Sequence, residues 1–249
     1  MNGFIEIVSG TLGGGKTAFA AERAFDHLCK GGYVYSNVEF YPTAIAARMA
    51  ELGLEFDPSR LVMLTGSARK FHEQISRGTA DSLVMLVIDE AGLELNARDY
   101  KQTDDTQMAF NTMARKLDIH LVYISQDMND VDKQIRRKAD TVWICRNMKK
   151  LKIWGVLPFP LPFYFRVRMD NTRGKLVKHD SEVVLPPLPS WGLYNSDAMV
   201  GDKAASFANL KQVVATPLRR IPKVKIVNKT KTDWLPVVAA LCAAFYVSF

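Results

Sequence analysis

Three apolar runs of strand length organise the first half of the chain: residues 4–9, 83–88 and 117–124. The second run is unbroken, which is typical of a central strand in a parallel sheet covered on both faces. After the first run, Ala18–Leu28 has the spacing of apolar positions expected of a helix. The pattern predicts an α/β fold with a mostly parallel sheet.

The pattern changes from residue 143 onward. Phe163–Met169 alternates apolar residues with arginine and leads into a turn at 170–175, so a small antiparallel β extension is expected over 143–185. Its aromatic residues, together with Arg166 and Arg168, suit either single-stranded DNA or a sheet with one packed and one wet face. Prolines then open a basic linker, expected over 186–233.

Between the first strand and the first helix, the chain has the pattern G-x-x-x-x-G-K-[ST] of a P-loop. The backbone N–H groups of such a loop surround phosphates, its lysine reaches the β- and γ-phosphates, and its hydroxyl holds Mg²⁺. Strand, loop and helix follow in the required order, which favours an ATP site over a chance glycine-rich turn. The candidate phosphate-binding residues are Gly10, Thr11, Leu12, Gly13, Gly14, Gly15, Lys16 and Thr17.

Two carboxylates, Asp89 and Glu90, follow the unbroken strand. Ligands of open α/β sheets bind at the carboxyl ends of the strands, so Asp89 is expected to hold Mg²⁺ together with Thr17. Glu90 is expected to act as the catalytic base for an attacking water. Its alternative role is that of an acid in the first turn of a helix, where it complements the helix dipole.

The strand at 117–124 ends in Ser125 and Gln126, either of which suits a sensor of the γ-phosphate or a solvent-facing loop. Basic residues lie on both sides of this strand. Among them, Arg115 and Arg136 are candidates for an arginine finger acting across a subunit interface, or are surface charges.

These motifs resemble the Zot family, the zonula occludens toxin-like assembly ATPases of filamentous bacteriophages. The resemblance is carried by Gly10–Thr17, Leu83–Gly92 and the stretch from Arg115 to Asp140, and includes a second strand ending in Asn37. The family often has Pro-Gly where this chain has Leu12-Gly13. It commonly has Arg-His where this chain has Arg115-Lys116, so only the arginine is carried over.

The P-loop, the acidic strand end and the resemblance together imply a RecA-like ATP hydrolase that uses ATP and Mg²⁺. The resemblance implies a homo-oligomer that drives assembly and extrusion of filamentous phage. Its partners would be other phage assembly proteins, including an outer-membrane secretin, and a phage single-stranded DNA complex. Two alternatives remain open: a nucleotide-gated membrane scaffold with negligible turnover, and a soluble P-loop kinase.

Charge divides unevenly along the chain. Residues 1–142 carry 16 basic and 20 acidic residues, whereas residues 143–249 carry 17 and 6, a balance that favours contact with an anionic surface. Residues 234–249 are uncharged and mostly apolar, and predict a transmembrane segment, short or truncated; the alternative for a run of this length is a buried C-terminal helix of a soluble protein. The basic cluster before it places the ATPase domain, residues 1–185, on the cytoplasmic side of the host inner membrane; it comprises Arg219, Arg220, Lys223, Lys225, Lys229 and Lys231.

Overall fold

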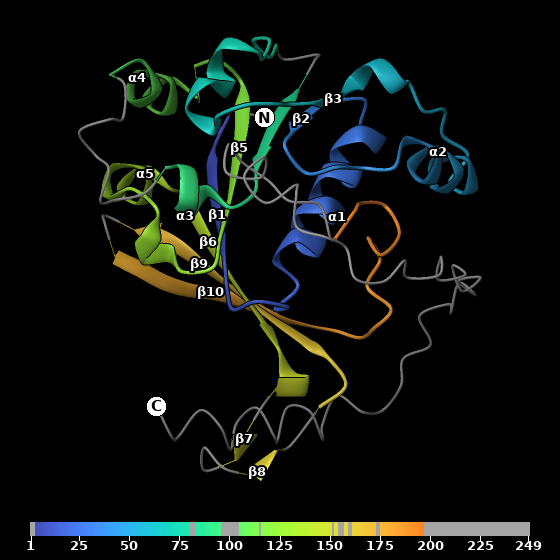
Figure 1. Cartoon of the computed structure of the whole chain (residues 1–249), viewed down its shortest axis with the longest axis vertical. Coiled ribbons are helices and arrows are strands. Elements are labelled where there is room, and N and C mark those ends of the chain that lie inside the picture. The colour runs from blue at the N-terminus through green and yellow to red at the C-terminus, as the bar shows by residue number, and fades with distance from the viewer. Residues whose placement is uncertain are drawn as a thin grey trace, which may run out of the picture. The chain divides into compact units, whose positions relative to one another are not determined.

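A sheet with helices on both faces is the frame of the molecule in the computed structural model (Figure 1). The structure describes residues 3–79, 83–95, 105–114, 116–150, 152–153, 157–158, 161–172 and 175–196. The strands are β1 (Ile5–Ser9), β2 (Tyr33–Ser36), β3 (Leu61–Met63), β4 (Val84–Ile88), β5 (Ile119–Ser125), β6 (Thr141–Asn147), β7 (Lys152–Ile153), β8 (Leu157–Pro158), β9 (Tyr164–Thr172) and β10 (Lys175–Val184). The α-helices are α1 (Lys16–Cys29), α2 (Pro42–Glu51), α3 (Ala91–Glu94), α4 (Asp105–Met113) and α5 (Lys133–Lys138).

The strand order within the described residues is β10-β9-β6-β1-β5-β4-β2-β3. The six strands from β6 to β3 are parallel, while β9 and β10 are antiparallel additions at one edge. The predicted mostly parallel α/β sheet and its small antiparallel extension are therefore confirmed. The extension begins later than expected, because the strand at residue 143 is β6, which runs parallel to β1.

Each face of the sheet is covered by its own apolar layer, since successive side chains of a strand point to opposite faces. Ile7, Leu86 and Tyr123 face one layer, whereas Val8, Val87 and Val122 face the other, which contains α1. Figure 1 shows α1 and α2 on one side of the sheet and α3, α4 and α5 on the other. This double cover is why the central strands lack a polar face.

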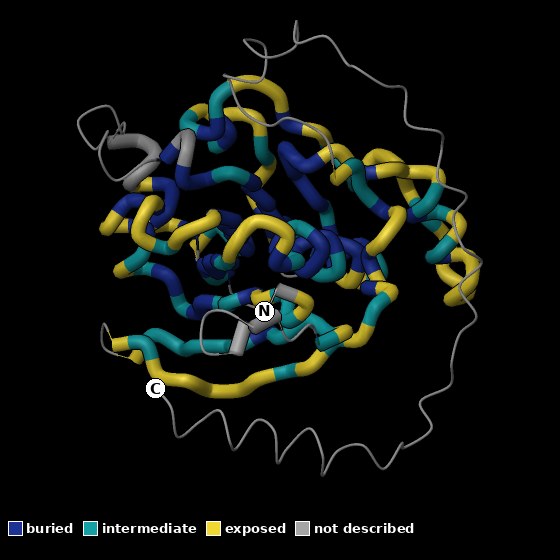
Figure 2. Tube along the Cα trace, turned by 60° about the horizontal axis from the view of Figure 1, so that its bottom comes forward, coloured by how far each residue is buried: buried dark blue, intermediate teal, exposed yellow. Residues whose placement is uncertain are grey.

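The antiparallel extension packs its arginines rather than exposing both of them. Arg166 is 3% exposed, contacts Glu22 and Glu182 at 2.9 and 3.0 Å, and lies over the ring of Phe19. The Arg168 guanidinium binds the Asp170 carboxylate at 2.9 Å. These ion pairs favour the packed-face interpretation of the arginine pattern over contact with DNA. The outer strand, β10, is largely exposed (Figure 2).

The chain after β10 also packs on the domain. Leu188, Ser190 and Leu193 are buried, so residues 185–196 lie against the domain, although the linker was expected to begin at 186. Within the part of the chain that the structure describes, no helix is long and apolar enough to cross a membrane. The predicted span, 234–249, lies outside that part.

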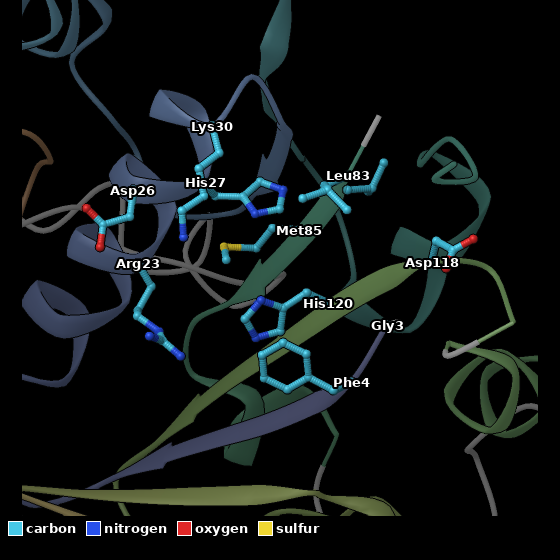
Figure 3. A pocket seen from close by; sticks show the side chains of 11 residues that line it. Gly3, Phe4, Arg23, Asp26, His27, Lys30, Leu83, Met85, Asp118 and His120 are labelled. Atoms are coloured by element: carbon cyan, nitrogen blue, oxygen red, sulfur yellow. The ribbon is translucent and has the colours of Figure 1, made fainter. Parts of the chain in front are cut away.

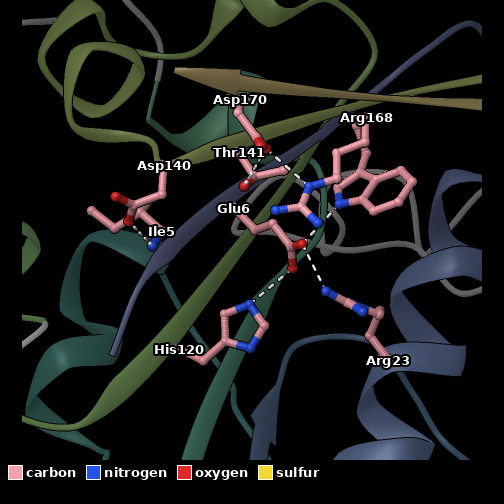
Figure 4. A network of polar contacts seen from close by, with 9 residues as sticks. Ile5, Glu6, Arg23, His120, Asp140, Thr141, Arg168 and Asp170 are labelled. Atoms are coloured by element: carbon pink, nitrogen blue, oxygen red, sulfur yellow. Dashed lines mark hydrogen bonds and ion pairs between the residues drawn. The ribbon is translucent and has the colours of Figure 1, made fainter. Parts of the chain in front are cut away.

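A buried carboxylate connects α1 to the middle of the sheet (Figure 4). Glu6 of β1 is 1% exposed and receives hydrogen bonds from Arg23 Nη2 at 2.9 Å and Trp143 Nε1 at 2.8 Å, and contacts His120 Nε2 at 2.9 Å. Burial raises the pKa of Glu6, but its contacts with His120, Arg23 and Trp143 outweigh burial and lower that pKa to about 2. The charge is therefore retained at neutral pH and ties three strands to the helix.

A cavity of about 120 Å³ lies next to this network, where β1, β4 and β5 begin and α1 ends (Figure 3). His27 lines it and is 9% exposed. Burial lowers the pKa of His27 to about 4, with repulsion from His120 and Lys30 adding to the shift and a hydrogen bond to the Leu83 backbone opposing it. The imidazole is therefore neutral in the folded protein at neutral pH.

We expect His27 to make the protein acid-sensitive. Its folded pKa lies below the unfolded value of 6.5, so the unfolded state takes up the proton first, and stability is lost as pH falls from 6.5 towards 4. Between pH 7 and pH 5 this group should cost about 2 kcal/mol of unfolding free energy. Denaturant titrations of wild type and His27→Leu at both pH values measure the loss. Equal losses in the two proteins would contradict the assignment.

Candidate nucleotide site

The P-loop leads directly from the end of β1 into α1. Gly15 has φ +88° and caps the helix, a conformation that side chains rarely adopt, and Gly14 N–H donates to Thr11 O at 2.9 Å. A Cβ on Gly15 would lie 3.0 Å from the ring of Tyr164. The first amides of α1 have no partner within the helix, so this end of the helix is suited to bind an anion.

Lys16 is 8% exposed, and its Nζ donates to Thr11 O at 3.3 Å. The ammonium group therefore stays at the loop without an acidic partner at hydrogen-bonding distance. A phosphate oxygen can replace the Thr11 carbonyl as its acceptor, which is the role that the sequence pattern predicts.

Thr17 and Asp89 meet across the sheet. Thr17 Oγ1 donates to Asp89 Oδ2 at 2.8 Å, although the two residues are 72 positions apart. Burial raises the pKa of Asp89, while the hydrogen bonds from Thr17 and from the Glu90 N–H oppose that rise. A hydroxyl and a carboxylate side by side are oxygen ligands that Mg²⁺ prefers, so these two residues fit a Mg²⁺ ion bound with a nucleotide.

Asn37 holds the end of β4 in place. Its Nδ2 donates to Asp89 O at 3.1 Å, and Asp89 N–H donates to Asn37 Oδ1 at 2.7 Å. Both groups are buried, and the side-chain amide takes the place of the strand partner that Asp89 lacks. The resemblance to the family indicated Asn37 only as the end of a strand. Its hydrogen bonds to Asp89 depend on β2 pairing with β4, and no local sequence pattern predicts that pairing.

Glu90 follows in an unusual conformation. Its φ is +55° and it caps α3, while its N–H donates to Asp89 Oδ1 at 2.7 Å. A left-handed residue other than glycine costs roughly 1–2 kcal/mol. The turn directs the backbone out of β4 straight after Asp89, and the Glu90 side chain is half-buried rather than packed into the core.

The two polar residues at the end of β5 differ in their surroundings. Ser125 is 2% exposed and its hydroxyl donates to Asp127 O at 2.8 Å, whereas Gln126 is exposed. Because β5 lies between β1 and β4, Gln126 stands between the P-loop strand and the strand of Asp89. The geometry favours Gln126 over Ser125 as the residue that faces a ligand.

Of the two arginine-finger candidates, the structure describes only Arg136. Arg136 lies on α5, where its Nη1 donates to Asn129 Oδ1 at 3.0 Å. Arg115 lies outside the described residues. The role of either arginine as a finger stays a prediction.

The end of β6 contacts the P-loop. No sequence pattern predicted this contact. Asn147 Nδ2 donates to Gly13 O at 3.1 Å, and a Cβ on Gly14 would lie 2.9 Å from Cys145 O. Burial raises the pKa of the Cys145 thiol to about 12. Cys145 is fully buried and packs in the apolar layer that contains α1.

We expect Asn37→Ala to weaken Mg²⁺-dependent nucleotide binding about tenfold, because it leaves the buried N–H and C=O of Asp89 without partners. Asn171→Ala is a matched control, since Asn171 also bonds backbone carbonyls but at the far end of β9. Calorimetric titrations with and without Mg²⁺ make the comparison. An equal loss of metal-free binding, or an equal loss in the control, would contradict the role given to Asn37.

Comparison with known proteins is consistent with this arrangement. The Gene 1 protein of Salmonella phage IKe is 31% identical over 156 residues, which is 60% of this chain and 42% of that protein. The Gene 1 protein of Enterobacteria phage f1 is 24% identical over 211 residues, which is 77% of this chain and 58% of that protein. The chain thus spans about half the length of these curated relatives.

Among solved structures, the N-terminal domain of zonular occludens toxin from Neisseria meningitidis has a similar fold, with a TM-score of 0.50 and 14% identity. The match covers 78% of this chain and all of that domain. The family model for zonular occludens toxin (Zot) matches residues 4–199, which include the P-loop, Asp89, the antiparallel extension and the segment packed after it. The chain therefore belongs to the Zot family, as the three motifs predicted.

Proposed function

We propose that the chain is an ATP hydrolase that powers assembly and extrusion of filamentous phage through the host inner membrane. The observation that carries the hydrolase part is the 2.8 Å hydrogen bond between Thr17 and Asp89, which joins the P-loop to the acidic strand end. The export part follows the role that membership of the Zot family implies.

In the proposed reaction, a water oxygen attacks the γ-phosphorus of ATP and the bond to the bridging oxygen of ADP breaks. Glu90 orients the water and takes its proton. Lys16 and the loop amides neutralise charge on the phosphates, and Gln126 contacts the γ-phosphate. Mg²⁺, held by Thr17 and Asp89, would supply further charge neutralisation when bound.

The proposed setting is a homo-oligomer at the inner membrane, with the ATPase domain in the cytoplasm and residues 234–249 as a single transmembrane anchor. The basic cluster before the anchor would contact anionic lipid. Other phage assembly proteins, an outer-membrane secretin among them, and a single-stranded DNA complex are the proposed partners.

ATP turnover with Mg²⁺ tests the hydrolase directly. We expect Lys16→Ala to abolish nucleotide binding and turnover, and Glu90→Gln to lower turnover at least 10²-fold with binding retained, because only the proton acceptor is lost. Glu51→Gln, at the exposed end of α2, is the matched control and should retain wild-type turnover. Wild type that binds ATP without hydrolysing it would instead support the nucleotide-gated scaffold.

A finger acting in trans makes turnover depend on association. We expect specific activity to rise with protein concentration, and Arg115→Ala or Arg136→Ala to lower turnover at least 10²-fold. Lys30→Ala, at the other end of α1, is the control and should leave it unchanged.

Mixing sharpens this test. A Lys16→Ala subunit lacks its own active site but keeps both arginines, so adding it to the inactive arginine variant should restore turnover. A flat concentration dependence together with no restoration would rule out a trans arginine.

A further inference from the structure

The segment of residues 185–196, called the strap below, crosses from one side of the P-loop helix to the other. It leaves β10 at one edge of the sheet and ends beside the chain that leaves β2, near the opposite edge. Figure 1 shows it in orange next to α1. To join these two places the strap must pass over α1, and it does so at the first turn of that helix.

The first half of the strap contacts the P-loop and the first turn of α1. Leu188 is 3% exposed, and its Cδ1 would lie 3.8 Å from a Cβ on Gly15. Ser190 is fully buried, and its Oγ donates to Ala18 O at 2.6 Å. Ala18 directly follows Thr17, so this hydrogen bond holds the helical turn whose amides face the phosphate site.

A second contact fixes the same half of the strap from the other side. The Arg48 guanidinium of α2 donates to Pro189 O, so the peptide before Ser190 is held by a different helix. Arg48 therefore holds the backbone from which the Ser190 hydroxyl donates to Ala18 O.

The second half of the strap contacts the chain that follows Asn37. Tyr41 N–H donates to Leu193 O at 2.8 Å, and Asn195 N–H donates to Glu39 O at 2.7 Å. Asn37 in turn pairs with the backbone of Asp89. One continuous segment thus contacts the first turn of α1 and the chain just after Asn37.

Tyr194 packs this half of the strap onto the domain. It forms a bridge with Phe40 and packs against the apolar layer that contains α1. Burial raises the pKa of Tyr194 to about 12, and the Asp89 carboxylate and Tyr164 add to the rise.

We infer that the strap positions the P-loop for nucleotide, with Ser190 and Leu188 as positioning residues that act through Ala18 and Gly15. Phosphate bound by the loop amides would stabilise the first turn of α1, and the strap holds the same turn. Each event therefore favours the other, and the coupling is reciprocal. The inference rests on nucleotide binding by the P-loop and is independent of the export role.

Nucleotide affinity tests whether the strap affects nucleotide binding. Ser190→Ala should weaken binding of ADP and of a non-hydrolysable ATP analogue about fivefold to tenfold, and raise KM for ATP more than it lowers kcat. Tyr35→Phe is the matched control, because it removes another inward-facing hydroxyl bond, to Ser76 Oγ, without touching the P-loop. Equal weakening in both variants would reflect general destabilisation and would overturn the inference.

Fluorescence of Trp191 tests whether nucleotide binding affects the strap. Trp191 is 46% exposed and lies on the strap next to Ser190, so ADP should change its emission. The change should vanish in Trp191→Phe, which removes the reporter, and in Lys16→Ala, which removes binding.

Calorimetry with ADP, read together with Trp191 emission, distinguishes failure of the strap inference from failure of the P-loop assignment. If wild type binds ADP with no change in Trp191 emission, and Ser190→Ala binds it equally well, the strap inference is wrong while the P-loop assignment stands. If wild type binds no nucleotide, the P-loop assignment fails and the strap inference fails with it.

Discussion

The contact between Thr17 and Asp89 constrains the rest of the site. It requires that β1 and β4 end at the same edge of the sheet and that α1 begin directly after the P-loop. A carboxylate that is 9% exposed is tolerated there because Thr17 and the Glu90 N–H donate to it and Asn37 satisfies its backbone. Removing one of these donors would leave a buried acceptor unpaired, which costs roughly 1–3 kcal/mol.

The same constraint on buried polar groups fixes α1 along its length. Arg23 reaches Glu6 in β1, and Glu22 reaches Arg166 in β9. Ser190 of the strap holds the first turn. These contacts come from three different parts of the chain, and their specific geometry opposes sliding or rotation of the helix. The helix whose first amides are proposed to bind phosphate is therefore held against the sheet, the extension and the strap together.

Local chemistry explains which features were predictable. The P-loop, the strand before it and the helix after it are contiguous, so their order alone indicated a phosphate site. The apolar run before Asp89 indicated a covered strand, which β4 is. The antiparallel extension was expected to begin at residue 143, but that residue lies in β6, which pairs parallel with β1 and antiparallel with β9. Whether a strand is parallel or antiparallel is a property of each pairing, so the sequence of one strand does not determine it.

The sequence by itself determined the fold class, the P-loop pattern and the strand that ends at Asp89, because each rests on residues close together in the chain. Only the tertiary structure decided that Asn37 aligns Asp89, that Asn147 supports Gly13 and that the strap crosses α1. These contacts join segments brought together by strand order and by the burial of apolar side chains. Neither cause leaves a pattern within any one segment, so the supports of the site become visible only in the folded chain.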